Sequence, residues 1–246
     1  MCLPARALGR LTFQAVRESV AARHPGPLRD ALRRRSAVHG RQLHLEYLRY
    51  SDAELTALLA RYLEAGIRPR LHALGNLAVR QAATALRAAG AGAGAAVIDH
   101  LVLLDPAAVD LVAASGAWAT FQPGFLTSFG PQIVDGGTDR FLTVLGGRQL
   151  LDAGVPLTLA SDYPAGPLDP LGNLRLAVHR TIQPAQALTP VEAVRALTVT
   201  AAASLGAPGG LVAGHPADLA ICDGDPFTPS TRVTQTWVAG RRVWPA

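Results

Sequence analysis

The sequence contains no lysine: all 23 basic residues among its 246 are arginines. Cysteine is nearly as scarce. Cys2 and Cys222 lie far apart without CxxC spacing, which excludes a disulfide scaffold and a cysteine-based zinc module. Long apolar runs are missing too, so we expect no transmembrane helix. The N-terminus also lacks the apolar stretch of a secretory signal, and this favours a cytoplasmic location.

The arginines are concentrated at the start of the chain. Residues 1–49 contain ten arginines and three acids, whereas residues 50–246 contain 13 arginines and 15 acids. The net charge of +5 therefore comes from one segment. A basic arm could grip phosphate, but few aromatic residues are available there for base stacking. We therefore do not expect nucleic acid as a partner. Residues 1–45 are interpreted as an Arg-rich leader, poorly ordered or out of context, with at most a short helix within 6–22.

Beyond the leader, short apolar stretches alternate with helical patterns. Such alternation is typical of βαβ units around a parallel sheet, either an open doubly wound sheet or a barrel. No glycine-rich phosphate-binding motif follows any of the predicted strands, so the nucleotide-binding form of the fold loses support. The predicted helices are 51–66, 77–89, 106–115, 139–153 and 189–205, and the predicted strands are 67–71, 95–99, 117–121 and 155–160.

The residue pattern changes near the end of the chain. Short β patterns separated by glycine and proline turns predict a small antiparallel β appendage over residues 209–246. Its predicted strands are 211–212, 217–222, 233–238 and 241–244.

Polar residues stand where four of the predicted parallel strands end: His72, His100, Gln122 and Asp162. Ligands bind at the carboxyl ends of strands in parallel α/β folds. Two imidazoles and a carboxylate presented there suit a divalent metal such as zinc. Each residue alone also has a structural reading, as a packed histidine or a loop-capping aspartate. The order His, His, Asp at successive strand ends favours a common metal-site origin.

Four motifs carry a family resemblance: His72-Ala-Leu-Gly-Asn76, Ile98-Asp-His100, Phe121-Gln-Pro123 and Ala160-Ser-Asp162-Tyr-Pro164. With the closing segment from Gly210 to Asp223, they resemble the second half of the amidohydrolase family 3 barrel. The resemblance covers about residues 46–246. It implies an α/β fold, an incomplete TIM-type (β/α) barrel with strands 5–8 over residues 46–208, followed by the small C-terminal β appendage.

The resemblance also implies roles for these residues. His72 and His100 would be metal ligands, and Asp162 a ligand that also moves the proton. Gln122 and Tyr163 would contact a small-molecule substrate. The implied cofactor is zinc or another divalent metal, which lowers the pKa of bound water to about 7. The implied reaction is hydrolysis of a C–N bond in an amide, cyclic amide or formamide-like compound.

The sequence departs from the family pattern in three ways. No His-x-His pair occurs, no lysine is present to bridge two metals, and Asn76 stands where the family usually has aspartate. A complete barrel takes roughly 250 residues, more than the barrel-like part offers. We therefore predict a truncated form with open sheet edges that favour self-association. The alternative is a catalytically inactive fragment, or a remnant that depends on a partner chain.

Overall fold

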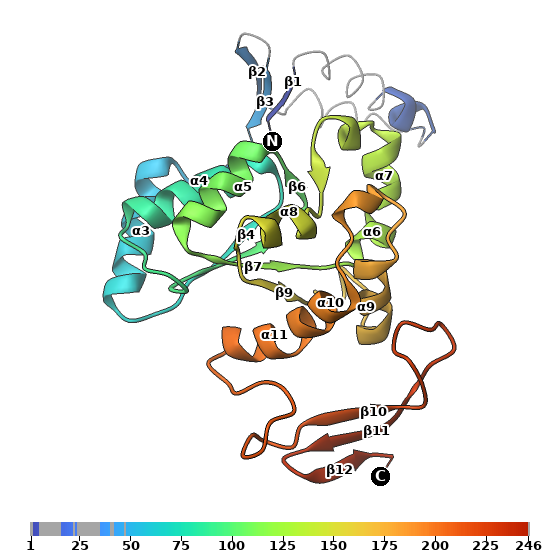
Figure 1. Cartoon of the computed structure of the whole chain (residues 1–246). Coiled ribbons are helices and arrows are strands. Elements are labelled where there is room, and N and C mark those ends of the chain that lie inside the picture. Colours follow the sequence, from blue (N-terminus) through green and yellow to red (C-terminus); the bar gives the residue numbers. More distant parts are fainter. Residues whose placement is uncertain are drawn as a thin grey trace.

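The computed structural model describes residues 2–4, 16–21, 23, 35–39, 42–46 and 48–245 (Figure 1). A parallel four-stranded sheet lies at the centre. Its order β4-β5-β7-β9 follows the sequence, and every neighbouring pair is parallel. This confirms the prediction of a parallel α/β fold. None of the helices in the described ranges is long and apolar enough to span a bilayer. The strands are β4 (Arg70–Ala73), β5 (Val97–His100), β7 (Trp118–Phe121) and β9 (Leu157–Leu159).

Helices connect and cover these strands. The helix α4 (Asn76–Ala88) contacts β4 and β5 and packs between α3 (Asp52–Glu64) and α5 (Pro106–Ser115). At the other edge of the sheet, α10 (Pro190–Leu197) and α11 (Val199–Ser204) contact β9. The apolar faces of strands and helices meet in one cluster of buried side chains. The carboxyl ends of the four parallel strands therefore lie at the same edge of the sheet.

Side-chain caps start the helices where the sequence predicts. Ser51 and Glu54 form a capping box at α3, and Thr189 and Glu192 form another at α10. Asp105 accepts a hydrogen bond from the Ala108 amide at the start of α5. Each cap satisfies backbone N–H groups that the first turn of a helix leaves without partners.

Two predicted helices are wrong in extent. The segment 139–153 does not form the long helix that was predicted. β-branched Thr143 and Val144 and the pair Gly146-Gly147 interrupt the helical pattern. The segment 189–205 is divided at Thr198, whose φ of −116° and ψ of −81° are not helical. The first segment contains η2 (Thr138–Arg140), β8 (Thr143–Val144) and α8 (Gly147–Asp152).

Several short elements were not predicted. β6 (Leu103–Leu104) pairs with β8 in an antiparallel ribbon. The others lie in connections for which no element was predicted, and they are α6 (Phe125–Ser128), α7 (Gly130–Asp135), α9 (Pro170–Val178) and η3 (Pro184–Gln186).

The leader contains a sheet that the sequence analysis missed. The strands β1 (Cys2–Pro4), β2 (Arg35–His39) and β3 (Gln42–Glu46) pair antiparallel in the order β1-β3-β2. Apolar and polar residues alternate from Gln42 to Glu46, which is the period of a strand. Residues 16–21 are helical, within the range predicted for a short helix. The rest of that predicted helix lies outside the described residues.

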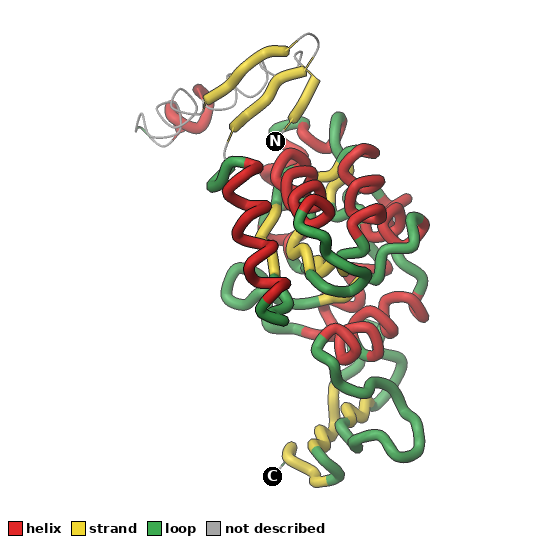
Figure 2. The backbone as a smooth tube through the Cα atoms, turned by 90° about the vertical axis from the view of Figure 1, so that its left-hand side faces the viewer, coloured by secondary structure: helices red, strands yellow, loops and turns green. Residues whose placement is uncertain are grey.

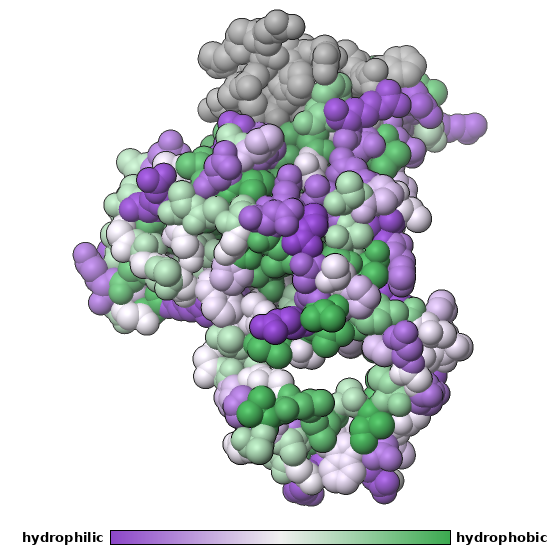
Figure 3. Space-filling view, viewed as in Figure 1, coloured by the Kyte–Doolittle hydropathy of each residue, from purple (hydrophilic) through white to green (hydrophobic). Residues whose placement is uncertain are grey.

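The predicted β appendage is present. β10 (Leu219–Cys222), β11 (Val233–Val238) and β12 (Arg241–Trp244) form an antiparallel sheet, whereas the predicted strand 211–212 is not formed. This sheet and β1–β3 lie at opposite ends of the molecule (Figure 2). Apolar patches face each other across a hollow between the sheet and the rest of the chain (Figure 3). Arg175 in α9 anchors the appendage by donating to the carbonyls of Pro226 and Thr231.

An ion pair between α8 and α10 gives a pH-dependent contribution to stability. Arg148 donates to both carboxylate oxygens of Glu192 at 2.7 and 2.8 Å. This contact and the amide of Thr189 lower the pKa of Glu192 to about 2. A carboxylate whose pKa is lower in the folded than in the unfolded chain stabilises the folded state at pH values above its unfolded pKa. This stabilisation is lost as pH falls toward the folded pKa of about 2. Solvent screening limits the contribution to about 1 kcal/mol.

We therefore expect Glu192→Gln to lower the free energy of unfolding by about 1 kcal/mol at pH 7. The difference from the unsubstituted chain should shrink as pH falls from 4.5 toward 2. Urea unfolding at several pH values measures it, and the exposed Glu64→Gln on α3 is the control. A difference that stays constant down to pH 2 would contradict the role of this ion pair.

Candidate functional site

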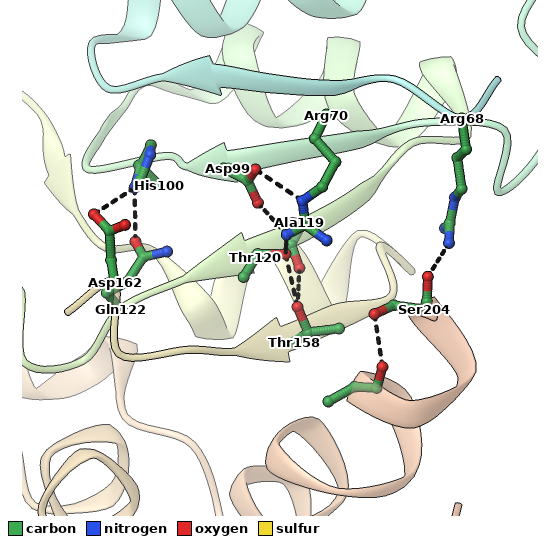
Figure 4. A network of polar contacts seen from close by, with 11 residues as sticks. Arg68, Arg70, Asp99, His100, Ala119, Thr120, Gln122, Thr158, Asp162 and Ser204 are labelled. Carbon is green, nitrogen blue, oxygen red and sulfur yellow. Dashed lines mark hydrogen bonds and ion pairs between the residues drawn. The ribbon is translucent and has the colours of Figure 1, made fainter. Parts of the chain in front are cut away.

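The carboxyl ends of the four parallel strands bring the predicted site residues together. His72 lies in β4, His100 ends β5, Gln122 follows β7 and Asp162 lies three residues beyond β9. The imidazole centres of His72 and His100 are 4.3 Å apart, with their planes at 72°. The Oδ2 atom of Asp162 lies 3.9 Å from Nδ1 of His100 (Figure 4). The three residues predicted as metal ligands therefore form one cluster.

The backbone at this cluster is strained. His100, Leu101 and Asp162 have φ values of 81°, 45° and 54°, a region that side-chain-bearing residues rarely occupy. Each such residue costs of order 1–3 kcal/mol, and these conformations gather at functional sites. Arg23, Leu145, Gln183 and Ala239 also have positive φ, so this backbone conformation is not confined to the cluster.

The electrostatics of the cluster keep one imidazole neutral. Desolvation lowers the pKa of His72, and the neighbouring His100 lowers it further. The carboxylates of Asp162 and Asp99 act in the opposite direction but do not reverse the shift. His72 is therefore neutral at pH 7 and keeps a nitrogen lone pair available for a proton or a cation.

The donor types suit zinc, but their arrangement is incomplete. A catalytic zinc site takes three protein ligands. Within the part of the chain that the structure describes, no group of three or more histidine, cysteine, aspartate or glutamate side chains could hold a metal ion. The cluster of His72, His100 and Asp162 therefore supplies only part of a metal site.

The two predicted substrate contacts differ in access. Tyr163 is 66% exposed beside Asp162, so its ring is open to a ligand. Gln122 is only 2% exposed, and its Oε1 lies 3.0 Å from Nδ1 of His100. Gln122 thus touches another site residue and offers little surface to a substrate.

The structure adds three polar side chains beside His72 that the sequence analysis did not single out. His72, Asp99, Thr120 and Thr158 are register partners on successive strands and share one face of the sheet. Arg70 donates to the carboxylate of Asp99 at 2.6 and 3.1 Å and to Oγ1 of Thr120 at 3.2 Å (Figure 4). Thr158 donates to Thr120 at 2.7 Å. The signal in the sequence was a polar residue inside each short apolar strand.

Asn76 has a local explanation. Its side-chain amide donates to the carboxylate of Asp105, which also accepts from Arg80 and caps α5. An aspartate at position 76 would place a second negative charge against Asp105. The amide is therefore the side chain that suits the cluster of Asn76, Arg80 and Asp105.

Comparison with known proteins identifies the family. The model of the amidohydrolase family matches residues 19–244, and the chain belongs to this family. The match begins earlier than the resemblance recognised from the motifs, which started at about residue 46. The family model therefore also covers part of the Arg-rich leader.

Named relatives are similar over most of this chain. It is 27% identical to N-substituted formamide deformylase of Arthrobacter pascens over 237 residues, which is 88% of this chain and 43% of the relative. It is 32% identical to imidazolonepropionase of Deinococcus radiodurans over 202 residues, covering 79% and 46% of the two chains. The chain thus spans less than half the length of these relatives.

Solved structures show the same fold. An uncharacterized metal-dependent hydrolase from Pyrococcus furiosus superposes with a TM-score of 0.66 at 23% identity, covering 75% of this chain and 39% of that one. A zinc-bound adenosine deaminase from Xanthomonas campestris superposes with a TM-score of 0.59 at 21% identity, covering 78% and 48% of the two chains.

Proposed function

We propose that the chain belongs to an enzyme that hydrolyses C–N bonds with a divalent metal such as zinc. The observation that carries this proposal is the meeting of His72, His100 and Asp162 at one end of the parallel sheet of an amidohydrolase-family chain. The substrate class is amides, cyclic amides or formamide-like compounds. N-substituted formamides are the first compounds to assay, because one relative is named for deformylating them.

Roles follow from position at the site. The Asp162 side chain is 43% exposed, so its carboxylate can reach a substrate and move a proton to the leaving nitrogen. His72 and His100 supply imidazole donors, and Tyr163 offers an exposed ring to the substrate. Further donors must join these residues before a metal site is complete.

The second candidate is a non-catalytic or partner-dependent fragment. The incomplete donor set among the described residues favours it. In this reading, residues 46–208 are strands 5–8 of a truncated barrel and 209–246 are its appendage. Self-association would use the β4 edge of the sheet and not the β9 edge. Arg70 and His72 of β4 are exposed, whereas Leu157 and Leu159 of β9 are buried.

A cytoplasmic location stays a prediction.

Titration with cobalt(II), a spectroscopic substitute for zinc, tests the proposal. Because the three side chains supply only part of a metal site, we expect weak but saturable binding of about one ion per chain, with affinity reduced further, by at least about tenfold, in His100→Gln and Asp162→Asn. A ligand should cost no less than an outer-shell partner, whose loss costs 10–100-fold. Asparagine tolerates the positive φ of Asp162, so the second variant should remain folded.

The control is His215→Gln, which removes a histidine outside the cluster and should leave the affinity unchanged. Equal cobalt affinity in all three variants, or no saturable binding by the unsubstituted chain, would reject the metal-site proposal. Either result would favour the non-catalytic reading.

A further inference from the structure

The buried side chain of Gln122 bonds His100 and lies beside the proposed catalytic Asp162. Its Oε1 atom is 3.0 Å from Nδ1 of His100, and the two residues are 2% and 6% exposed. An amide oxygen can only accept a hydrogen bond. With Oε1 facing the ring, this contact is a hydrogen bond when Nδ1 of His100 carries the proton and donates it.

The surroundings of Nδ1 agree with this direction. The carboxylate of Asp162 lies 3.9 Å from the same nitrogen, beyond hydrogen-bond length but near enough to favour a proton there. A carboxylate offers no donor that could use an Nδ1 lone pair. Both neighbouring groups thus favour the same tautomer of His100.

The chain also holds Gln122 and the imidazole in place. The Gln122 carbonyl accepts from the amide of Phe125, and the Phe125 ring stacks on His100 at 5.9 Å with the planes 13° apart. The Gly124 amide donates to the buried side chain of Asn173 in α9 at 2.7 Å. The turn from Gln122 to Phe125 therefore forms a hydrogen bond with the edge of the imidazole and packs against its face.

We propose that Gln122 is a positioning residue that fixes the Nδ1–H tautomer of His100 and leaves the Nε2 lone pair for the ligand. The ordinary partner of such a lone pair is a divalent cation or an acidic proton, and the hydrogen bond at one ring nitrogen sets the state of the other. In this proposal Gln122 acts on His100 and does not contact the substrate, as the sequence analysis had predicted it would. It builds on the proposed function for the use of Nε2, but the tautomer itself does not depend on any activity.

Nitrogen-15 NMR of the metal-free, histidine-labelled chain at pH 8 tests the assignment. The His100 signals are identified by their loss in His100→Gln. We expect a pyrrole-type Nδ1 and a pyridine-type Nε2 in the unsubstituted chain. Gln122→Leu should shift His100 toward the Nε2–H form that free histidine favours, whereas Gln122→Glu, which retains an acceptor, should keep the Nδ1–H form.

Two further results would overturn the assignment. An Nε2–H tautomer in the unsubstituted chain would reject it even if Gln122→Leu failed to fold. Loss of the Nδ1–H form in Asp162→Asn, with its retention in Gln122→Leu, would transfer the role to Asp162. A correct tautomer without cobalt binding would leave the positioning role standing and remove the metal-site proposal.

Discussion

Arg180→Met is expected to lower the free energy of unfolding by about 3 kcal/mol. Arg180 is 5% exposed and donates at 2.7 Å to the carbonyls of Val144, Leu145 and Ile182. Hydrogen bonds from a charged donor contribute about 1.5–3 kcal/mol each, and the substitution leaves three carbonyls without this partner.

Burial of the charge offsets part of this stabilisation. Desolvation lowers the pKa of Arg180 to about 10, which corresponds to a cost of about 3 kcal/mol. Methionine avoids that cost, so the net loss is smaller than the three hydrogen bonds suggest. The hydrogen bonds still prevail, because together they exceed the desolvation cost.

Urea unfolding at pH 7 measures the effect, with Arg195→Met on the exposed side of α10 as the control. Arg180→Lys keeps the charge, but one ammonium group cannot span all three carbonyls, so we expect an intermediate loss. If Arg180→Met were as stable as the unsubstituted chain, the connection between β8 and the segment after α9 would not depend on this side chain.

The elements that the sequence predicted well are those with local causes. The Ser51/Glu54 and Thr189/Glu192 boxes begin helices because their partners are three residues apart. The segments 139–153 and 189–205 were read as long helices because apolar periodicity continues through them. The first interruption has a local signal in Thr143, Val144 and the pair Gly146-Gly147, but the strand that forms there depends on the pairing of β8 with β6. Periodicity alone does not detect such partners.

The candidate site also combines features that the sequence predicts with features that depend on distant contacts. His72, His100 and Asp162 could be predicted to meet, because parallel strands end at one edge of a sheet. The support around them could not be predicted. Asn173 reaches Gly124 across 49 positions of sequence, and a glutamine or phenylalanine after a strand does not reveal whether it faces substrate or imidazole. Geometry decides that Gln122 touches His100.

The loop that carries Asp162 depends on a glycine with no room for a side chain. A Cβ atom on Gly166 would approach the backbone oxygen of Ser161 far inside 3.0 Å, a separation that Cβ atoms do not adopt. The Gly166 amide also donates to the Asp162 carbonyl at 3.1 Å. Backbone atoms cannot rotate away as a flexible side chain can. A methyl group at position 166 must therefore move the turn that positions the carboxylate.

We expect Gly166→Ala to lower the free energy of unfolding by about 3 kcal/mol, the upper range for overpacking a tight site. It should also weaken cobalt binding as Asp162→Asn does, because the carboxylate shifts. The matched control is Gly92→Ala, where a Cβ meets nothing within 4 Å, so stability should change by less than about 0.5 kcal/mol. Urea unfolding and cobalt titration of both variants measure the two effects. If Gly166→Ala matched the control in both, the turn would be free to adjust, and the position of Asp162 would not be set by this contact.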